Sequence, residues 1–501
     1  MNKPAPKSLL RPGPKIEGGL DAIVLGGSPD GLAAAGLMAK GGLSVMVIEN
    51  GAVARERREF APGFFCDDGD PIAGSIDAGV VDGLDLYRHG LSFARRRLET
   101  LVRFSDRATL IFGGDPSLMS EAAGAMSPLD AERLRDFVER VFDDARRWGA
   151  WFAGGDRAIV PGTDDLTASL DQRLAGRFKD VRIEDYLRAE ALLRGALRPT
   201  EPYSWLALPH RWAGDAAGLQ AGLAAIDGGE RALVAALRRA CQAFGVVFRQ
   251  TDRVRSALVE WDGTAGLALD DGGQIRAPIV VSALSARESF LGLVGRARLD
   301  IEFANFAAAP RPRIASVRAH VALDALPDEE VTLSRPDRRF IYAPSAAETH
   351  LAWRMALEGR AGAPALAEAM IPSAIDPSLA PGGGATVTML LHPVALYTEE
   401  DETPRAALEE AAAVTLDRLL PGAGLGFVAI DFEPVMPAVA PIAVAEEQRR
   451  IFAEATGIDG LFFCGPEAQL GSRLSLASGR RAAERALDFA RLSVKQGRNT
   501  R

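Results

Sequence analysis

The sequence predicts an α/β protein whose main sheet is parallel and is assembled from distant parts of the chain. Three observations carry this prediction. Near its start, a short apolar strand runs through a glycine-rich turn into an alanine-rich helix and a second apolar strand. Helix and strand patterns alternate again over residues 231–282, and an apolar strand followed by a helix closes the chain after residue 461. Strands that alternate with helices are typical of parallel sheets.

The first unit is the most informative of the three. Asp21 to Leu25 predicts a strand, Gly26 to Gly31 a tight turn, residues 32–39 a helix and Val45 to Glu49 a second strand. In a dinucleotide-binding βαβ unit of this order, backbone N–H groups and a helix N-terminus meet a pyrophosphate. An acid about 20 residues further on then holds a ribose. The residues predicted to form the site here are Gly26, Gly27, Ser28, Gly31 and Glu49.

The glycine fingerprint departs from its usual form in ways that bear on function. Ser28 stands where a second glycine would let the pyrophosphate approach closely. Pro29 removes one N–H donor, and Asp30 adds a negative charge beside the expected phosphates. The Ser28 hydroxyl can itself donate to a phosphate oxygen. Nucleotide binding is predicted, and weaker binding or an empty site is the alternative.

Composition limits the classes of function. At 501 residues the chain is long enough for two domains, and 48% hydrophobic with 25% charged residues is typical of a globular protein. A net charge of -9 argues against nucleic acid as a partner. No stretch approaches the roughly 20 apolar residues of a membrane span, and residues 1–18 lack the apolar core of a signal peptide. We expect a cytoplasmic protein with a flexible tail over residues 1–18.

Cysteine and histidine spacing predicts neither a redox pair nor a metal site. Cys66, Cys241 and Cys464 are odd in number and far apart, so the sequence offers no disulfide framework and no C-x-x-C motif. The five histidines show no spacing that suggests zinc. We expect these residues to be structural and the protein to hold no metal.

The remaining elements are predicted from periodicity and turn residues. The middle patch reads as one helix and a series of strands: 231–244, 246–249, 254–260, 265–269 and 276–282. Residues 77–222 read mainly as helices and loops, including a helix start at Ser127 to Glu132. The later elements are predicted over residues 314–323, 386–391, 404–420, 461–465 and 479–492.

Together, the three patches resemble the phytoene-desaturase-like oxidoreductases of the amine-oxidase-type FAD superfamily, and most closely their pyridine nucleotide-disulfide oxidoreductase domain-containing protein 2 branch. The most specific matches lie at Gly245 to Arg249, Asp252 to Val254, Asp271 to Gly273 and Val280 to Ala283. The resemblance implies a Rossmann-like FAD-binding domain made of three sequence segments, with an inserted α+β substrate domain. The FAD-binding segments would be 19–76, 223–295 and 441–495, and the substrate segments 77–222 and 296–440.

The resemblance also assigns roles to residues. Gly26, Gly27, Ser28 and Gly31 would line the FAD pyrophosphate. Glu49, with the adjoining Asn50, would meet the adenosine ribose, and the Val254 backbone would meet the adenine. Gly465 and Glu467 would lie beside the ribitol and pyrophosphate. The loop under the isoalloxazine would be Gly471, Ser472, Arg473 and Leu474. The helix that starts near Ser478 would point its positive end at the flavin, which favours the anionic reduced ring.

This sequence departs from the family pattern at three places that touch flavin. These are Ser28, the segment Asn50 to Ala52 and the segment Gly471 to Arg473, where the family carries further glycines. Arg473 is large for a position beneath an isoalloxazine, although a guanidinium there would stabilise reduced flavin.

The first hypothesis is an FAD-dependent dehydrogenase or desaturase that moves a hydride from an apolar, polyene- or isoprenoid-like substrate to flavin N5, without a named catalytic acid or base. One alternative is a flavin-free family member that acts as a binding or assembly partner of a catalytic paralogue. Others are an amine oxidase-type flavoenzyme and, on weaker grounds, an NAD-linked dehydrogenase. Homo-oligomerisation and peripheral membrane contact are left open. The aromatic residues considered for an apolar tunnel, or else for core packing, are Trp148, Trp151, Tyr203, Trp205, Trp212 and Trp353.

Overall fold

The structure is a computed structural model of the chain. It describes residues 19–49, 57–67, 69–113, 118–124, 127–152, 159–193, 195, 197–216, 218–250, 254–308, 314–360, 366–395, 405–433, 436–437, 457–468 and 474–499.

A five-stranded parallel sheet gathers strands from the beginning, middle and end of the chain. Its strands, in the order β11-β2-β1-β15-β22, are Val247–Gln250, Val45–Glu49, Ala22–Leu25, Ile279–Ser282 and Leu461–Phe463. All four pairings are parallel. The predicted α/β fold class with a parallel sheet is therefore confirmed.

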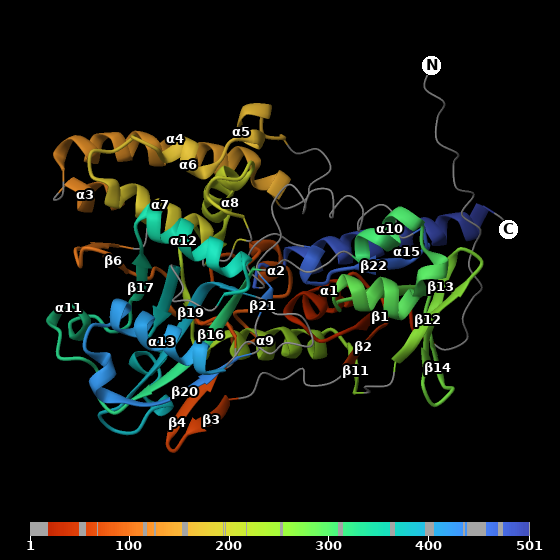
Figure 1. Cartoon of the computed structure of the whole chain (residues 1–501). Coiled ribbons are helices and arrows are strands. Elements are labelled where there is room, and N and C mark those ends of the chain that lie inside the picture. The colour runs from red at the N-terminus through yellow and green to blue at the C-terminus, as the bar shows by residue number, and fades with distance from the viewer. Residues whose placement is uncertain are drawn as a thin grey trace.

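Helices cover one face of this sheet and a β-meander covers the other (Figure 1). The helices are α1 (Pro29–Lys40), α2 (Ala78–Gly83), α9 (Gly229–Ala243) and α15 (Ala477–Asn499). The meander consists of β12 (Val254–Glu260), β13 (Gly263–Leu269) and β14 (Gln274–Arg276). The strand predicted over 276–282 is divided in the structure, because Arg276 ends the meander and β15 begins only after Pro278. Proline has no N–H to continue a ladder.

A second, mixed sheet lies beside the first. Its main path has the order β20-β16-β19-β18-β17-β6-β7, and β21 (Met436–Pro437) also pairs with β16. The path strands are Phe427–Phe432, Ile314–Leu323, Ala385–Ala395, Leu366–Met370, Arg339–Ala343, Thr100–Phe104 and Thr109–Phe112. The β17–β6 pair is parallel and the others are antiparallel.

Strands β6 and β7 were not predicted, since residues 77–222 read as helices and loops. Every residue of β6 is buried, so this strand carries no alternation of polar and apolar residues. A short strand buried on both faces resembles a piece of buried helix when read from periodicity alone.

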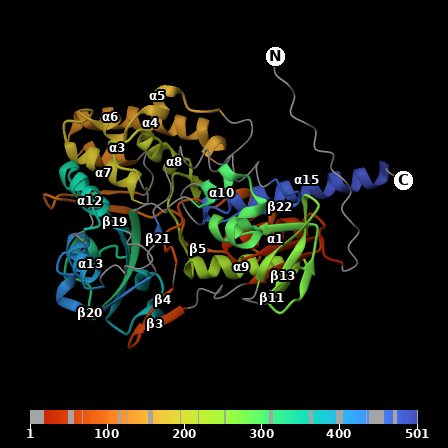
Figure 2. The same cartoon turned by 45° about the vertical axis from the view of Figure 1, so that its right-hand side comes forward.

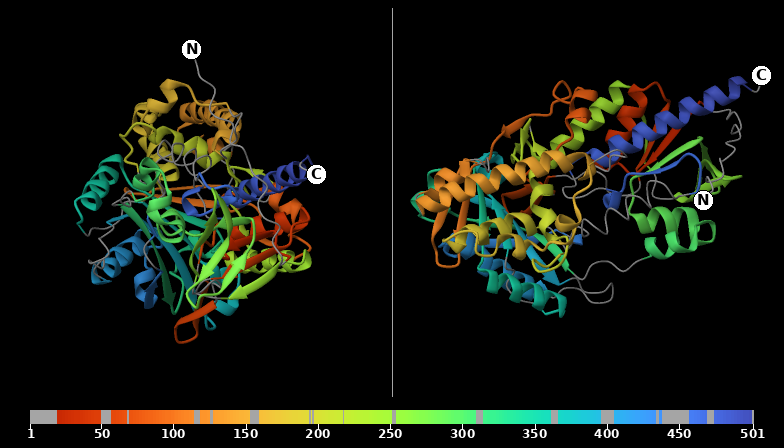
Figure 3. Two further views of the ribbon diagram at one scale, coloured as in Figure 1. Left: turned by 90° about the vertical axis from the view of Figure 1, so that its right-hand side faces the viewer. Right: turned by 90° about the horizontal axis from the view of Figure 1, so that it is seen from above.

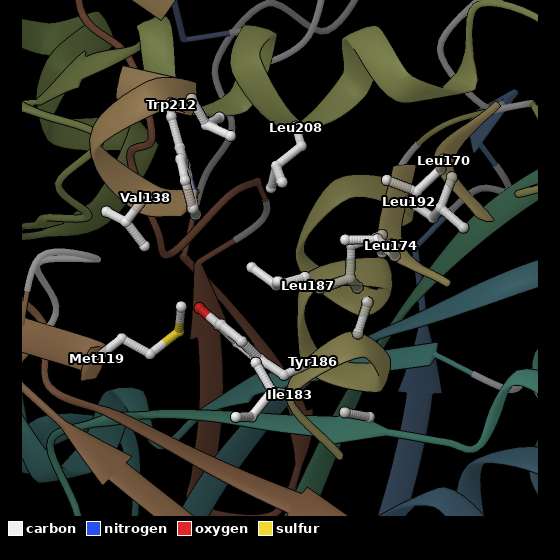
Figure 4. Close-up of a cluster of buried hydrophobic side chains, with 14 of the residues drawn as sticks. Met119, Val138, Leu170, Leu174, Ile183, Tyr186, Leu187, Leu192, Leu208 and Trp212 are labelled. Atoms are coloured by element: carbon white, nitrogen blue, oxygen red, sulfur yellow. The ribbon is translucent and has the colours of Figure 1, made fainter. Parts of the chain in front are cut away.

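A helical layer covers one face of the mixed sheet (Figures 1 and 2). It consists of α3 (Met119–Gly124), α4 (Pro128–Phe152), α5 (Thr163–Thr167), α6 (Leu170–Leu174), α7 (Val181–Leu192), α8 (Ala207–Ala213) and α12 (Ala346–Leu357). Helix α13 (Arg405–Leu419) packs on the opposite face. Figure 4 shows the core beneath the helical layer, where Tyr186 and Trp212 lie among aliphatic side chains.

Short elements complete the described chain. They are α10 (Ile301–Ala307), α11 (Glu330–Leu333), β3 (Arg57–Ala61), β4 (Phe64–Asp67), β5 (Phe93–Arg95), β8 (Asp215–Ala216), β9 (Leu219–Gln220) and β10 (Ala225–Ile226). Seen from above in Figure 3, the helical layer and the parallel sheet lie toward opposite ends of the molecule, and α15 extends away from the body.

Candidate functional site

The turn between β1 and α1 has the backbone that a dinucleotide site requires. Gly26 has a φ of +103°, which glycine adopts without steric cost. A Cβ on Gly31 would lie 2.4 Å from the Gly26 carbonyl oxygen, so glycine is needed for α1 to begin this close to β1. Two of the three glycine roles, the tight turn and the close helix packing, are therefore fulfilled.

Ser28 occupies the place of the missing glycine and caps α1. Its Oγ accepts a hydrogen bond from the Gly31 N–H at 3.3 Å, and Pro29 follows at the first helical position without an N–H. A hydroxyl that accepts a hydrogen bond can still donate one, so Ser28 can offer its O–H to a phosphate oxygen. The start of α1 therefore offers a hydroxyl in place of some of the usual backbone donors.

Asp30 joins the starts of two helices. Its carboxylate is 5% exposed, and Oδ1 accepts from the Ser478 hydroxyl at 2.7 Å and from the Gly479 N–H at 3.1 Å. A Cβ on Gly479 would lie 2.2 Å from the Asp30 carbonyl oxygen. Helices α1 and α15 are therefore packed backbone to backbone, with the Asp30 carboxylate at the positive end of α15.

Glu49 ends β2, as predicted, and is nearly buried. Its carboxylate accepts a hydrogen bond from Arg238 of α9, and the Arg238 guanidinium lies 4.6 Å from the centre of the Phe248 ring. A ribose at this position would share the Glu49 carboxylate with a guanidinium. The arginine also holds that carboxylate in one orientation.

The end of the chain meets the same edge of the sheet. A Cβ on Gly465 would lie 1.9 Å from the Leu284 carbonyl oxygen, and Cys464 N–H donates to Ser282 at 2.8 Å. Burial, with the charge of Asp30, raises the pKa of the Cys464 thiol well above its usual value. Glycine at 465 is thus required by the chain's own packing.

Arg481 places a second charge near this edge. Burial, only partly opposed by the negative charge of Asp30, lowers the pKa of Arg481 to about 10. The side chain remains a cation at neutral pH and donates to the Ala468 carbonyl.

The other predicted site residues are placed only in part. Val254 begins β12 opposite Leu269 and packs in the meander core, and Leu474 is fully buried. The backbone of Glu467 lies in a short 3-10 helix, Pro466–Ala468. The side chain of Glu467 lies outside the described residues, as do Asn50, Gly471, Ser472 and Arg473.

A small hollow with a volume of about 50 Å³ lies between α9 and the mixed sheet. We call it the α9 hollow. Its apolar wall contains Phe65, Pro71, Ile226, Met370, Ile375 and Leu379, and its polar wall contains Asp67, Asp70, Glu230, Asp376, Thr386 and Thr388. The first residues of α9, Gly228 to Glu230, close one side.

The α9 hollow is connected to the dinucleotide unit through α9 itself. Glu230 lines the hollow, and Arg238, eight residues later on the same helix, bonds to Glu49. Eight residues of α-helix span about 12 Å. The hollow thus lies beyond the carboxyl ends of β1 and β2, where ligands of open α/β sheets bind.

Two threonines of β19 face the hollow with different bonding. Thr388 Oγ1 is 3.1 Å from His320 Nδ1. The Thr386 hydroxyl is buried, and among the described residues it has no hydrogen-bond partner. A buried hydroxyl without a partner costs free energy, so Thr386 is a ready partner for a polar ligand atom.

A network of buried, charged side chains adjoins the hollow. Arg318 forms an ion pair with Asp70 at 3.0 Å and donates a hydrogen bond to Glu433 at 2.6 Å. Glu433 also accepts from the Gly69 N–H at 2.9 Å and lies 3.1 Å from His320 Nε2. Burial alone would raise the pKa of Glu433, but the His320 hydrogen bond and the Arg318 charge lower it to about 2. The carboxylate is therefore ionised at neutral pH.

This network and the threonines of the hollow were not predicted from the sequence. One sequence pattern, however, indicates them. Arg318 and His320 alternate with apolar residues along β16, as Thr386 and Thr388 do along β19. Period-2 polar residues in an otherwise apolar strand indicate a second, polar face.

The six aromatic residues considered for a tunnel pack in the core beneath the helical layer or against it. None of them lines the α9 hollow. In the described part of the chain, no group of three His, Cys, Asp or Glu side chains could hold a metal ion. Within the same ranges, none of the helices is both long and apolar enough to cross a membrane.

The comparisons with known proteins find sequence relatives and solved structures of similar fold. No family model matches the chain. Over 431 residues it is 24% identical to the mouse (Mus musculus) pyridine nucleotide-disulfide oxidoreductase domain-containing protein 2. The matched region covers 76% of this chain and 73% of the mouse protein.

Two solved structures illustrate the fold. An oxidoreductase from Methanosarcina mazei superposes with a TM-score of 0.62 at 14% identity, covering 93% of this chain and 100% of its own. Cyclohexylamine oxidase from Brevibacterium oxydans superposes with a TM-score of 0.59 at 16% identity, covering 94% and 99%. At these identities the likeness shows the fold.

The residues of the dinucleotide unit fit a dinucleotide. Gly26 and Gly31 provide the turn and the close packing, and Ser28 keeps a hydroxyl to donate. Glu49 ends β2, where an acid would meet a ribose. The charge of Asp30 in the first turn of α1 would oppose a pyrophosphate.

Proposed function

We propose that this chain is an FAD-dependent oxidoreductase of the dehydrogenase or desaturase type, with an apolar substrate held in the α9 hollow. One observation carries the proposal. The Gly26–Gly31 turn, Glu49 and the start of α15 converge at the carboxyl edge of one parallel sheet, and α9 links that edge to the hollow. The names of the mouse relative and the two solved structures support an oxidoreductase, and the phytoene-desaturase-like branch is part of this proposal.

Backbone groups would make most of the contacts with the cofactor, and few side chains would take part. The turn and Ser28 would meet the pyrophosphate, Glu49 the ribose and the Val254 backbone the adenine, with Gly465, Glu467 and residues 471–474 along the remaining part. Bound FAD would supply a ring able to accept a hydride.

The chain's own task is to bind and orient the substrate. The apolar wall of the α9 hollow would exclude water and contact the part of the substrate that enters the hollow. The hydroxyl of Thr386 would bind a polar atom of the substrate and thereby fix its direction.

An amine oxidase-type activity is a second candidate, and the polar wall of the hollow favours it. Four carboxylates line the hollow: Asp67, Asp70, Glu230 and Asp376. Three arginines pair with them, since Arg57 bonds Asp67 and Asp376, Arg231 bonds Asp67 and Arg318 bonds Asp70. A cationic substrate head would meet these carboxylates.

A flavin-free binding partner is the third candidate. Ser28 and Asp30 favour it, because the first replaces a glycine and the second opposes a pyrophosphate.

The absorbance spectrum of the purified protein, with identification of any released cofactor, separates these candidates. We expect flavin bands after gentle purification or after FAD is added, and substrate-dependent bleaching of those bands without oxygen. Bleaching by apolar polyenes supports the dehydrogenase, and bleaching by amines supports the oxidase. A colourless protein that takes up no FAD would establish the binding partner instead.

The site assignment is tested with Glu49→Ala. Loss of the ribose acceptor should reduce the amount of FAD retained through gel filtration by at least about tenfold. Glu302→Ala, which removes the same charge from the exposed surface of α10, should retain as much FAD as the unmodified chain. Equal retention in both variants would contradict the role of Glu49.

A further inference from the structure

Asp30 brings a buried negative charge to the place where two helices begin. α1 starts one residue before it and α15 starts next to its carboxylate. Free N–H groups and the dipole make a helix start attractive to an anion. At the start of α15 the Asp30 carboxylate already fills that place, through Ser478 and Gly479.

The same charge lies in the first turn of α1, beside the group that the β1–α1 turn would bind. A pyrophosphate would lie against Ser28 and the first N–H groups of α1, and Asp30 is the second residue of this helix. Pro29 supplies no N–H there, and the Gly31 N–H is bonded to Ser28. The turn therefore offers few compensating donors against repulsion between carboxylate and phosphate.

The charge of Asp30 affects the pKa values of two neighbouring residues. The Asp30 carboxylate helps to raise the pKa of the Cys464 thiol, and it opposes the lowering of the pKa of Arg481 by burial. Arg481 is a cation and offsets part of the negative charge. The remaining effect on an incoming anion should be moderate.

We propose that Asp30 sets the affinity of this site, acting as a built-in anion that weakens pyrophosphate binding so that the dinucleotide exchanges instead of staying tightly bound. This inference rests on the proposed function and concerns the same site. Asp30 is a positioning residue for α15 and a specificity-determining charge for the dinucleotide.

The structure offers a clean variant. In Asp30→Asn the side-chain oxygen can still accept from Ser478 and Gly479, so the contact between α1 and α15 is kept while the charge is removed. Glu484→Gln is the matched control, because it removes one negative charge from an exposed side chain of α15. Melting temperatures of all three proteins establish that they are folded.

The measurement is the Kd of FAD and of ADP, by flavin fluorescence quenching and by calorimetry, at low and high salt. We expect Asp30→Asn to bind both ligands about tenfold more tightly than the unmodified chain, and Glu484→Gln to bind them as the unmodified chain does. Because Asp30 is nearly buried, the difference between Asp30→Asn and the unmodified chain should persist at high salt.

The outcomes separate this inference from the proposed function. Equal or weaker FAD binding by Asp30→Asn overturns the inference and leaves the flavin proposal standing. Absence of binding of either ligand to every protein overturns both. If Asp30→Asn does not fold, Asp30→Ser, which also removes the charge and keeps a hydroxyl oxygen as acceptor, takes its place, and FAD binding no tighter than that of the unmodified chain overturns the role of Asp30.

Discussion

At the scale of single residues, the chain supplies its own partners to groups that a dinucleotide would use. Glu49 is bonded by Arg238, and the start of α15 is bonded by Asp30. The position of Glu49 was predictable, because an acid at the end of the second strand is a local pattern. Arg238 was not, because it lies 189 residues further along and reaches Glu49 only once α9 packs beside β2.

Glu433 leads to a prediction about acid stability. The pKa of Glu433 is about 2, against an ordinary value of 4.5. The contribution of its charge to the free energy of unfolding is therefore complete above about pH 5 and is lost as the pH falls toward 2. The shift corresponds to about 3 kcal/mol. We expect Glu433→Gln to lower the free energy of unfolding by about that amount at pH 7, with the difference shrinking as the pH falls.

Urea unfolding at several pH values between 7 and 3 measures this difference. Glu409→Gln is the control, because Glu409 forms an exposed pair with Arg405 at 2.8 Å and should change the unfolding free energy by less than about 0.5 kcal/mol. A difference for Glu433→Gln that stayed constant with pH would show that its charge is not what stabilises the fold.

At the scale of elements, prediction succeeded where a local pattern decides the structure. The strand predicted over 314–323 has those bounds as β16, and the predicted helix 231–244 differs from α9 by a residue or two at its ends. β6 was missed because neighbouring strands and helices bury it, and β7 is the half-exposed edge strand that pairs with it. β6 pairs with β17, about 240 residues away, and no local signal reports such a partner.

Arg339 ties the helical layer to the mixed sheet. It lies in β17 and donates to Glu190 of α7 at 2.7 Å and to Glu368 of β18 at 2.6 Å. Arg211 of α8 adds a contact to Glu190 at 3.0 Å. Arg339, Glu190 and Glu368 are almost entirely buried.

Arg339→Met should therefore be strongly destabilising. It leaves two buried carboxylates without their main partner, which typically costs about 3–5 kcal/mol. Chemical denaturation measures the loss, and proteolysis at low protease should cleave the helical layer first. Arg491→Met, which breaks an exposed pair on α15, should leave both measurements unchanged. A similar small effect for both variants would mean that the helical layer is held by apolar packing alone.

At the scale of the whole molecule, the two sheets divide the proposed work. The parallel sheet presents the dinucleotide edge, the mixed sheet forms the wall of the α9 hollow, and α9 touches both. The sequence predicted the first sheet because its motif is local. The hollow arises from β4, the start of α9, β18 and β19 meeting in space, so its residues could not be assembled from sequence spacing.

Substitution of Thr386 tests whether the hollow is a binding site or a packing defect. Its hydroxyl is 2% exposed, lines the hollow and has no partner among the described residues. Thr386→Val keeps the shape and removes the hydroxyl, so the unfolding free energy should rise by about 1 kcal/mol. Thr415→Val is the matched control, since the buried Thr415 hydroxyl donates to the Ala411 carbonyl at 2.6 Å and its loss should cost about 1 kcal/mol.

The same pair of variants separates binding from stability. If the hollow binds substrate through Thr386, the more stable Thr386→Val protein should bind or turn over substrate at least about fivefold less well at unchanged FAD affinity. Thr415→Val should be less stable with substrate binding intact. A gain in stability with no loss of binding would mean that the substrate binds elsewhere. The reason is that a buried polar group that lowers stability is expected to be retained because it serves a function.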